Sequence, residues 1–280
     1  DWVAQSFRMK KDSQLPAKVS VHPAGNDFFT TMPCLLPSDK ERFGVKVVSR
    51  ILGRTPSLSS DILLYNSANG ELLALINADW ITSMRTGAVA TLAIKTLRSS
   101  SARKYSFIGL GNTARATLLC LLSSFPDEIF QVVLFRYKDQ AEYFIDYFRT
   151  FGNVVFSVVD TMEELVEDAD VLVSCITDAD GLLIGNDALF KPGILLVPVH
   201  TRGFQNCDLF FDKVFADDTE HVRSFRYFNQ FKWFNEIGDV LDGTCRGREN
   251  DKERILSYNI GLGLHDVFFA SNIYDMITNR

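Results

Sequence analysis

The sequence lacks the features that mark several protein classes. No apolar run approaches the roughly 20 residues of a membrane span, and there is no signal-peptide pattern, internal repeat or low-complexity segment. The five cysteines are scattered and odd in number, and no two have the spacing of metal ligands, which predicts free thiols in a reducing cytoplasm and no metal site. Basic residues are fewer than acidic ones, 29 against 35, so the net charge of −6 argues against a nucleic-acid or membrane partner.

The length and composition are typical of a soluble globular protein. The 280 residues suffice for one large or two ordinary domains, and an apolar fraction of 46% can supply a sizeable core. The chain opens at Asp1 rather than at a methionine, which leaves the position of the native N-terminus open.

The pattern of apolar residues changes near residue 100. Before it, the sequence predicts a sheet followed by a helix, with strands at 45–48, 62–65 and 72–76, a hairpin turn at Asn69-Gly70 and a helix at 82–97. After it, strands and helices alternate, which predicts a parallel sheet covered on both faces. The expected strands are 105–108, 131–135, 154–158, 171–175, 194–198 and 214–216, and the expected helices are 113–124, 138–150 and 161–167. Residues 249–253 suggest a solvated helix start, and a last helix at 261–277 is expected to pack back on the first domain.

A glycine-rich turn follows the strand that ends at Ile108. Gly109, Gly111 and Ala114 form the G-x-G-x-x-A version of the dinucleotide fingerprint, between a strand and a helix. The first glycine allows a tight turn, the second allows close approach of a pyrophosphate, and the alanine permits close helix–strand packing. Glycines also end strands for structural reasons alone, but this context favours a nucleotide site at the helix N-terminus.

Two cationic residues stand in unexpected places. Arg85 lies near the start of a predicted helix, where a positive charge opposes the helix dipole, so an anionic ligand would explain it and an exposed arginine is the alternative. Lys46 lies in the middle of an apolar strand, where it either extends to solvent from an edge or points into a polar pocket.

The sequence resembles the ornithine cyclodeaminase/mu-crystallin family of NAD(P)-dependent enzymes over most of its length. The segments that carry the resemblance are Thr31-Met-Pro, Gly44-Val-Lys-Val-Val, Ile81-Thr-Ser-Met-Arg-Thr-Gly-Ala, Ile108-Gly-Leu-Gly-Asn-Thr-Ala, Ala169-Asp-Val-Leu-Val-Ser-Cys-Ile-Thr, Gly247-Arg248 and Gly261-Leu-Gly-Leu-His-Asp. The resemblance implies an α/β fold with a doubly wound Rossmann domain, residues 99–255. It also implies a substrate-binding and dimerisation domain with a mixed sheet built from both chain ends, residues 1–98 and 256–280. A cytoplasmic homodimer is the expected form.

The resemblance also implies roles for individual residues. Lys46 matches a lysine that contacts the substrate carboxylate and is a candidate acid or base, and Arg85 is a second candidate contact for that carboxylate. The residues implied to bind the cofactor are Arg85, Thr86, Gly109, Gly111, Asn112, Thr113, Ala114, Thr177 and Asn259.

Two positions depart from the family pattern. Lys18 stands where the family often has an arginine, so it can pair with a carboxylate but lacks the bidentate fork. His200 aligns near the catalytic aspartate of ornithine cyclodeaminases, which weakens the case for deamination with ring closure. His200 is therefore a candidate acid or base, and a histidine with no chemical role is the alternative.

The end of the second expected Rossmann strand bears on the cofactor. Arg136 follows that strand, and an arginine there suits the 2′-phosphate of NADP, although it can also stack on the adenine of NAD. The sequence therefore favours NADP and keeps NAD as the alternative.

Three functions remain in competition. The first is an NAD(P)-dependent oxidoreductase that transfers hydride between nicotinamide and an α-amino acid, a keto-acid-derived imine or a cyclic ketimine. The second is an ornithine cyclodeaminase that recycles its NAD, and the third is a non-catalytic protein that binds NADPH or a small ligand. The identity of the substrate depends on folded geometry and is not readable from the sequence.

Overall fold

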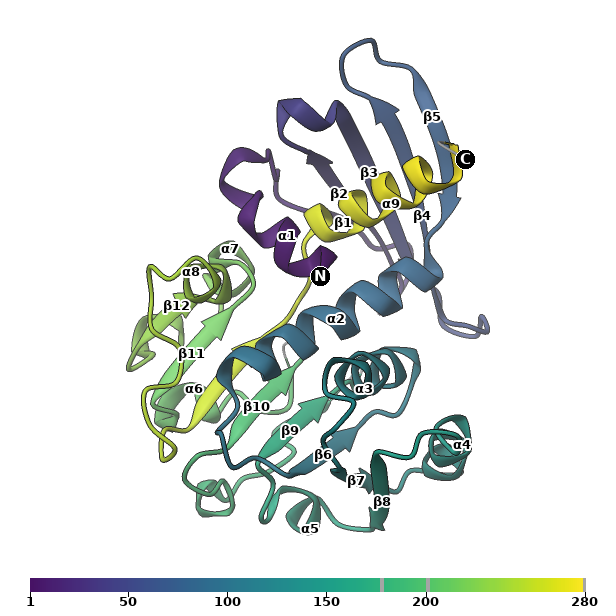
Figure 1. The fold of residues 1–280 in the computed structure, drawn as a ribbon. Helices are drawn as coiled ribbons and strands as arrows, with labels where there is room; N and C mark the ends of the chain where they lie inside the picture. Colours follow the sequence, from purple (N-terminus) through teal and green to yellow (C-terminus); the bar gives the residue numbers. More distant parts are fainter. Residues whose placement is uncertain (177–178, 200–201, 279–280) are drawn as a thin grey trace. The chain divides into compact units, whose positions relative to one another are not determined.

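The computed structural model describes residues 1–176, 179–199 and 202–278 of the 280-residue chain. The chain divides into two compact units (Figure 1). Unit 1 combines Asp1–Arg85 with Gly261–Arg280, and unit 2 is Thr86–Ile260. Within the described residues, every helix is too short or too polar to span a membrane.

Unit 1 is built on a five-stranded sheet in the order β1-β2-β3-β4-β5. The strands are β1 (Val19–Val21), β2 (Phe28–Leu35), β3 (Arg42–Arg50), β4 (Leu58–Asn66) and β5 (Leu72–Asn77). All four strand pairs are antiparallel, so the expected mixed sheet is wrong in this detail. The physical reason is that short hairpin connections join consecutive strands, and the C-terminal segment of unit 1 supplies a helix instead of a strand.

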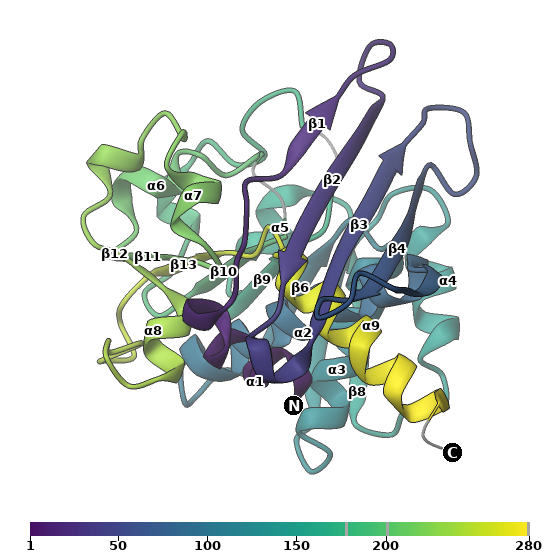
Figure 2. The ribbon, with the colours of Figure 1, turned by 90° about the horizontal axis from the view of Figure 1, so that it is seen from above.

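That helix, α9 (Gly263–Thr278), packs on one face of the sheet, against β2, β3 and β4 (Figure 2). Its first nine residues are buried, and six of them are glycine or apolar. The N-terminal helix α1 (Trp2–Arg8) packs against α9, and two short 3-10 helices, η1 (Lys10–Asp12) and η2 (Ser38–Lys40), complete the unit. The predicted return of the last helix to the first domain is confirmed.

Unit 2 is built on an eight-stranded parallel sheet in the order β12-β11-β13-β10-β9-β6-β7-β8. The strands are β6 (Lys104–Ile108), β7 (Phe130–Phe135), β8 (Val154–Val159), β9 (Val171–Ser174), β10 (Leu195–Pro198), β11 (Lys213–Ala216), β12 (Phe234–Glu236) and β13 (Ile255–Tyr258). The chain reverses direction across the sheet between β6 and β9, as in a doubly wound Rossmann fold. The predicted alternation of strands and helices is confirmed.

Helices connect these strands. They are α3 (Asn112–Ser124), α4 (Gln140–Tyr147), α5 (Met162–Val166), α6 (Cys207–Phe210), α7 (Thr219–Val222) and α8 (Ile237–Leu241), with the 3-10 helices η3 (Asp187–Leu189) and η4 (Phe228–Gln230). The inner strands β9, β10 and β13 are buried along their whole length, which explains their unbroken apolar runs.

The unit boundaries lie inside the segments that the sequence assigned to the first domain. The long helix α2 (Asp79–Leu97) crosses from unit 1 to unit 2 after Arg85. Its later turns belong to unit 2 because they pack on α3, where the Thr91 hydroxyl donates a hydrogen bond to the Thr117 carbonyl (3.1 Å). Residues 256–260 also belong to unit 2, because β13 is an inner strand of the parallel sheet.

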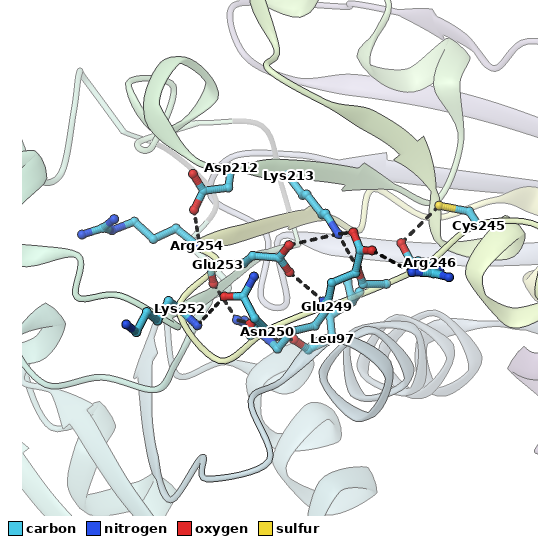
Figure 3. A network of polar contacts seen from close by, with 12 residues as sticks. Leu97, Asp212, Lys213, Cys245, Arg246, Glu249, Asn250, Lys252, Glu253 and Arg254 are labelled. Atoms are coloured by element: carbon cyan, nitrogen blue, oxygen red, sulfur yellow. Dashed lines mark hydrogen bonds and ion pairs between the residues drawn. The ribbon is translucent and has the colours of Figure 1, made fainter.

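A network of polar contacts fixes the segment that precedes β13 (Figure 3). The Lys213 ammonium lies 2.7 Å from Glu249 and 3.2 Å from Glu253, and it donates to the Gly247 carbonyl. The Arg248 guanidinium donates to the Leu97 carbonyl (2.7 Å). The expected solvated helix start is therefore wrong, because no helix forms at 249–253. Glu249 and Glu253 instead pair with Lys213, which is nearly buried.

Candidate functional site

A cavity of about 430 Å³ lies in unit 2. It is lined by residues that follow or end β6, β7 and β9 and by one from α4, namely Ile108, Gly109, Gly111, Phe135, Tyr137, Gln140, Cys175 and Ile176. The cavity therefore sits at the carboxyl ends of the strands where the strand order reverses, which is where open α/β sheets bind ligands.

The two fingerprint glycines have different structural roles. Gly109 has φ +79°, and a Cβ there would lie 2.5 Å from the backbone of Cys175 and Ile176, so only glycine fits the turn. Gly111 has an ordinary φ of −82°, and a Cβ there would meet no heavy atom within 4 Å. Gly111 also lines the cavity, and the space where its Cβ would stand is free of protein atoms.

The other fingerprint residues form the first turn of α3. Asn112 is exposed, Thr113 is half-buried and Ala114 is fully buried. Gly111 is the residue before this 13-residue helix and supplies no side-chain cap. The backbone N–H groups of the first turn and the positive end of the helix dipole therefore suit an anionic group.

Arg136 follows β7 but forms ion pairs with two carboxylates. Its Nε lies 2.7 Å from Asp160, and its Nη1 lies 2.8 Å from Glu142. The side chain is half-exposed. Its neighbour Tyr137, rather than Arg136, lines the cavity.

Asn259 lies directly after β13 and is buried. Its backbone N–H donates to the Pro198 carbonyl (3.0 Å) and its side-chain amide donates to the Ser257 carbonyl (2.7 Å). Among the residues that the structure describes, no group donates to its buried Oδ1, so this atom can accept a hydrogen bond from a ligand. Thr177 and His200, which the sequence also predicts at the site, lie outside the described residues.

A second candidate site is a buried charged cluster in unit 1. The Lys46 ammonium, from β3, lies 2.6 Å from one carboxylate oxygen of Asp266, and the Nε of Arg85, from α2, lies 2.8 Å from the other. All three side chains are buried, with exposed fractions of 1%, 4% and 0% for Lys46, Arg85 and Asp266. The structure thus brings together Lys46 and Arg85, and it places Lys46 in a polar interior site instead of at a solvent edge.

The charges of the cluster perturb one another. Burial and the neighbouring Arg85 lower the pKa of Lys46 to about 8, although Asp266 opposes the shift. Burial alone would raise the pKa of Asp266, but Arg85 and Lys46 outweigh that effect and hold it below its usual value. The carboxylate therefore stays ionised at neutral pH, and the cluster carries two cations against one anion.

This excess positive charge points to an anionic ligand. The Nη1 of Arg85 is buried and has no hydrogen-bond partner within the described parts of the chain. The guanidinium lies against Gly261, which has φ +95° and where a side chain would collide with it. Lys18 is exposed but close enough to contribute to the lowered pKa of Lys46. An incoming carboxylate would balance the charge and accept the available hydrogen bond.

Asp266 is the residue that the sequence analysis missed. Helix α2 begins at Asp79, so Arg85 lies in its second turn, away from the first turn where the dipole argument applies. The anion beside Arg85 in this structure is the protein's own carboxylate, Asp266. The signal for Asp266 was an acidic residue in the first turn of an otherwise apolar helix, within Gly-Leu-His-Asp. Nothing in its local sequence indicates two cationic partners more than 180 residues away.

The cysteine thiols near these sites are unreactive. Burial, together with Asp266, raises the pKa of Cys34 to about 12. Burial raises the pKa of Cys175, in the cavity wall, to about 12. Both thiols stay protonated at neutral pH, so neither is suited to act as a nucleophile.

The chain belongs to the ornithine cyclodeaminase/mu-crystallin family, whose model matches residues 1–280. It is 27% identical over 256 residues to Delta(1)-pyrroline-2-carboxylate reductase from Bacillus cereus, covering 84% of this chain and 77% of that protein. Its fold is similar to that of Thermococcus litoralis Delta(1)-pyrroline-2-carboxylate reductase in complex with NADH and L-proline (TM-score 0.86, 22% identity, 99% and 92% of the two chains). An archaeal alanine dehydrogenase dimer with bound NAD is equally similar in fold (TM-score 0.86, 24% identity, 100% and 91%).

Proposed function

We propose that the protein is an NAD(P)-dependent reductase that acts on an imine or cyclic ketimine bearing a carboxylate. The observation that carries the proposal is the buried cluster of unit 1, in which Lys46 and Arg85 share a single carboxylate. Two buried cations with one anion are suited to bind a substrate carboxylate. The similarity to a Delta(1)-pyrroline-2-carboxylate reductase supports the same class of substrate.

The cavity of unit 2 is the proposed dinucleotide site. Gly111 leaves open space at the start of α3, and the buried Oδ1 of Asn259 can accept a hydrogen bond. We propose that the first turn of α3 binds the pyrophosphate and that Tyr137 contacts the adenosine half. Thr86, Thr177 and Asn259 are proposed contacts of the remaining half. Bound as the reduced form, the nicotinamide supplies the hydride.

The choice between NAD and NADP rests on Arg136. The sequence predicts NADP, and that preference stays a prediction. Two carboxylates, Asp160 and Glu142, pair with this guanidinium and would repel a 2′-phosphate. This arrangement supports binding of NAD(H) over NADP(H), as do the two solved structures of similar fold that hold NADH and NAD.

Lys46 is the proposed proton donor. With a pKa of about 8, its ammonium is mostly protonated at neutral pH yet can release a proton readily. Arg85 is the proposed anchor of the carboxylate, because a guanidinium keeps its proton. His200 remains the alternative acid, and Lys18 remains a proposed second contact for the carboxylate.

We also propose that the protein is a homodimer. One face of the unit 1 sheet packs on α9, and the opposite face carries a row of apolar residues that pair across the strands, Pro33, Val45, Leu63 and Leu75. Leu75 is 70% exposed. A second copy is the proposed cover of this face, and the dimeric alanine dehydrogenase of similar fold supports it.

The test is a spectrophotometric screen of cyclic ketimine carboxylates and of α-keto acids plus amines, with NADH and NADPH. We expect substrate-dependent loss of reduced nicotinamide. In Lys46→Met the turnover should fall by about 100-fold, a barrier increase of roughly 2.7 kcal/mol, with dinucleotide affinity unchanged. Near-normal kcat/KM in Lys46→Met would exclude the role of Lys46. Ammonia release from ornithine without net NADH formation would favour the cyclodeaminase alternative, and dinucleotide binding without turnover of any substrate would favour the binding-protein alternative.

A further inference from the structure

The carboxylate of Asp266 divides its two oxygens between two cations. We infer that Asp266 is a positioning residue that keeps the Lys46 ammonium charged and aligned beside Arg85, so that Lys46 delivers the proton in the reduction while Arg85 anchors the substrate carboxylate. The inference rests on the proposed function, because it assigns a division of labour within that same site.

The geometry fixes each partner from a different element. Lys46 comes from β3, Arg85 from α2 and Asp266 from the first turn of α9, and the two contacts to Asp266 are 2.6 Å and 2.8 Å long. An ammonium has three N–H donors and the contact to Asp266 uses one of them, so the same nitrogen can also face a ligand. Helix α9 places Asp266 near its positive end, which stabilises the carboxylate as an anion.

The charges explain why Lys46 needs this carboxylate. The groups that face its ammonium are Arg85 from α2, Asp266 from α9 and Lys18 from the segment before β1. Burial, Arg85 and Lys18 all favour loss of the lysine proton, and Asp266 favours its retention. Cys34, from β2, faces Asp266 as a neutral thiol, because its pKa is raised to about 12. Asp266 is therefore the negative charge that holds the proton on Lys46.

The arrangement serves the reduction of a C=N group. The π bond of the C=N group breaks, the carbon receives the hydride of NADH or NADPH, and the nitrogen receives a proton from Lys46 Nζ. The products are the amine and oxidised dinucleotide, and the neutral lysine regains its proton from solvent. The proton donor must be charged before each turnover, so activity depends on the state that Asp266 maintains.

The experiment compares Asp266→Asn with Asp275→Asn. Asp275 lies on the same helix α9 and pairs with Arg42 through a partly exposed contact of 2.8 Å. Its replacement removes an equal charge that is not among the groups acting on Lys46. Two readouts are taken across pH: kcat/KM, and an NMR titration of isotope-labelled lysine side chains in the full-length protein with and without dinucleotide. The Lys46 signal is assigned by its loss in Lys46→Met.

We expect Lys46 to titrate near pH 8 in the wild type and in Asp275→Asn, and at least one pH unit lower in Asp266→Asn. The alkaline fall of kcat/KM should shift with it, and the rate at pH 7.5 should drop by roughly threefold or more. An unshifted Lys46 titration in folded Asp266→Asn overturns the inference. The NMR readout needs no substrate, so a shifted titration in a protein that reduces no imine supports the role of Asp266 on Lys46 protonation and refutes the proposed function alone.

If Asp266→Asn fails to fold, Asp266→Glu provides a second test of the positioning role. The longer side chain keeps the charge and displaces it, so the titration of Lys46 should stay within about half a pH unit of wild type while kcat falls with little change in KM. Wild-type kcat in folded Asp266→Glu would overturn the positioning role.

Discussion

Substitution of Gly111 by valine offers the sharpest test of the dinucleotide site, because the structure separates its effect on binding from any effect on folding. The Gly111 backbone has φ −82°, and a Cβ there meets no heavy atom within 4 Å. The cost to folding is therefore limited to the weaker preference for valine before a helix, about 1 kcal/mol. A branched side chain would, however, occupy the room proposed for the pyrophosphate.

Gly109→Ala supplies the contrast. At φ +79° an alanine is strained by roughly 1–3 kcal/mol, and its Cβ would lie 2.5 Å from the Cys175 and Ile176 backbone. We expect a loss of unfolding free energy of about 2 kcal/mol or more and a Tm lower by several degrees. Gly109→Ala should therefore lower the stability of the fold, whereas Gly111→Val should lower the affinity for dinucleotide.

The assays are calorimetric titration with NADH and NADPH, and thermal unfolding without ligand. Gly152→Val is the matched control, because its Cβ also meets nothing within 4 Å and Gly152 does not line the cavity. Gly111→Val should keep a Tm close to that of Gly152→Val and lose roughly 100-fold in dinucleotide affinity, about 2.7 kcal/mol. Equal affinities in these two valine variants would show that the dinucleotide does not bind beside Gly111.

Three further predictions address other parts of the molecule. The NADP prediction requires Arg136→Asp to lower the affinity for NADPH relative to NADH by roughly tenfold. Because Asp160 and Glu142 already pair with the guanidinium, we expect a smaller change in the ratio of the two Kd values, and a tenfold change would support NADP instead. Burial raises the pKa of Asp208 to about 6, above its ordinary 3.8. As pH rises, the unfolded state therefore releases this proton before the folded state does. The wild type should lose about 2 kcal/mol of unfolding free energy between about pH 4 and pH 6. Denaturant unfolding should show a smaller loss over that window in Asp208→Asn, and identical slopes would contradict the assignment. Leu75→Asp should give a monomer by light scattering, Val155→Asp on the exposed strand β8 should not, and a dimeric Leu75→Asp would place the interface elsewhere.

Much of the fold was readable from the sequence because local signals agreed. The strand before Gly109, the helix after it and the alternation beyond it all predict a parallel sheet, and the sheet has that order. The hairpin at Asn69-Gly70 likewise predicts the pairing of β4 with β5. These features depend on short stretches of chain, where turn chemistry and apolar periodicity decide the outcome.

Only part of the candidate site could be predicted from the sequence, because its residues pair with partners that are distant in the chain. Lys46 and Arg85 attract notice as charges in apolar surroundings, but their common partner is Asp266, at the far end of the chain. The cavity has the same character, since Phe135, Tyr137 and Cys175 come from strands that only the sheet order brings together. Domain boundaries are also decided by packing, because α2 is one continuous helix whose two halves belong to different units.

The contact between Arg85 and Gly261 has a consequence for how the chain can be engineered. Unit 2 is an insertion in unit 1, and these two residues are the last before it and the first after it. Because the Arg85 side chain touches Gly261, the entry and exit of the insertion are separated by no more than the reach of an arginine. Unit 2 is therefore an insertion that a few flexible residues could replace, leaving a chain of about a hundred residues that keeps Lys46, Arg85 and Asp266. Such a minimal protein would let the buried charged cluster be studied by itself.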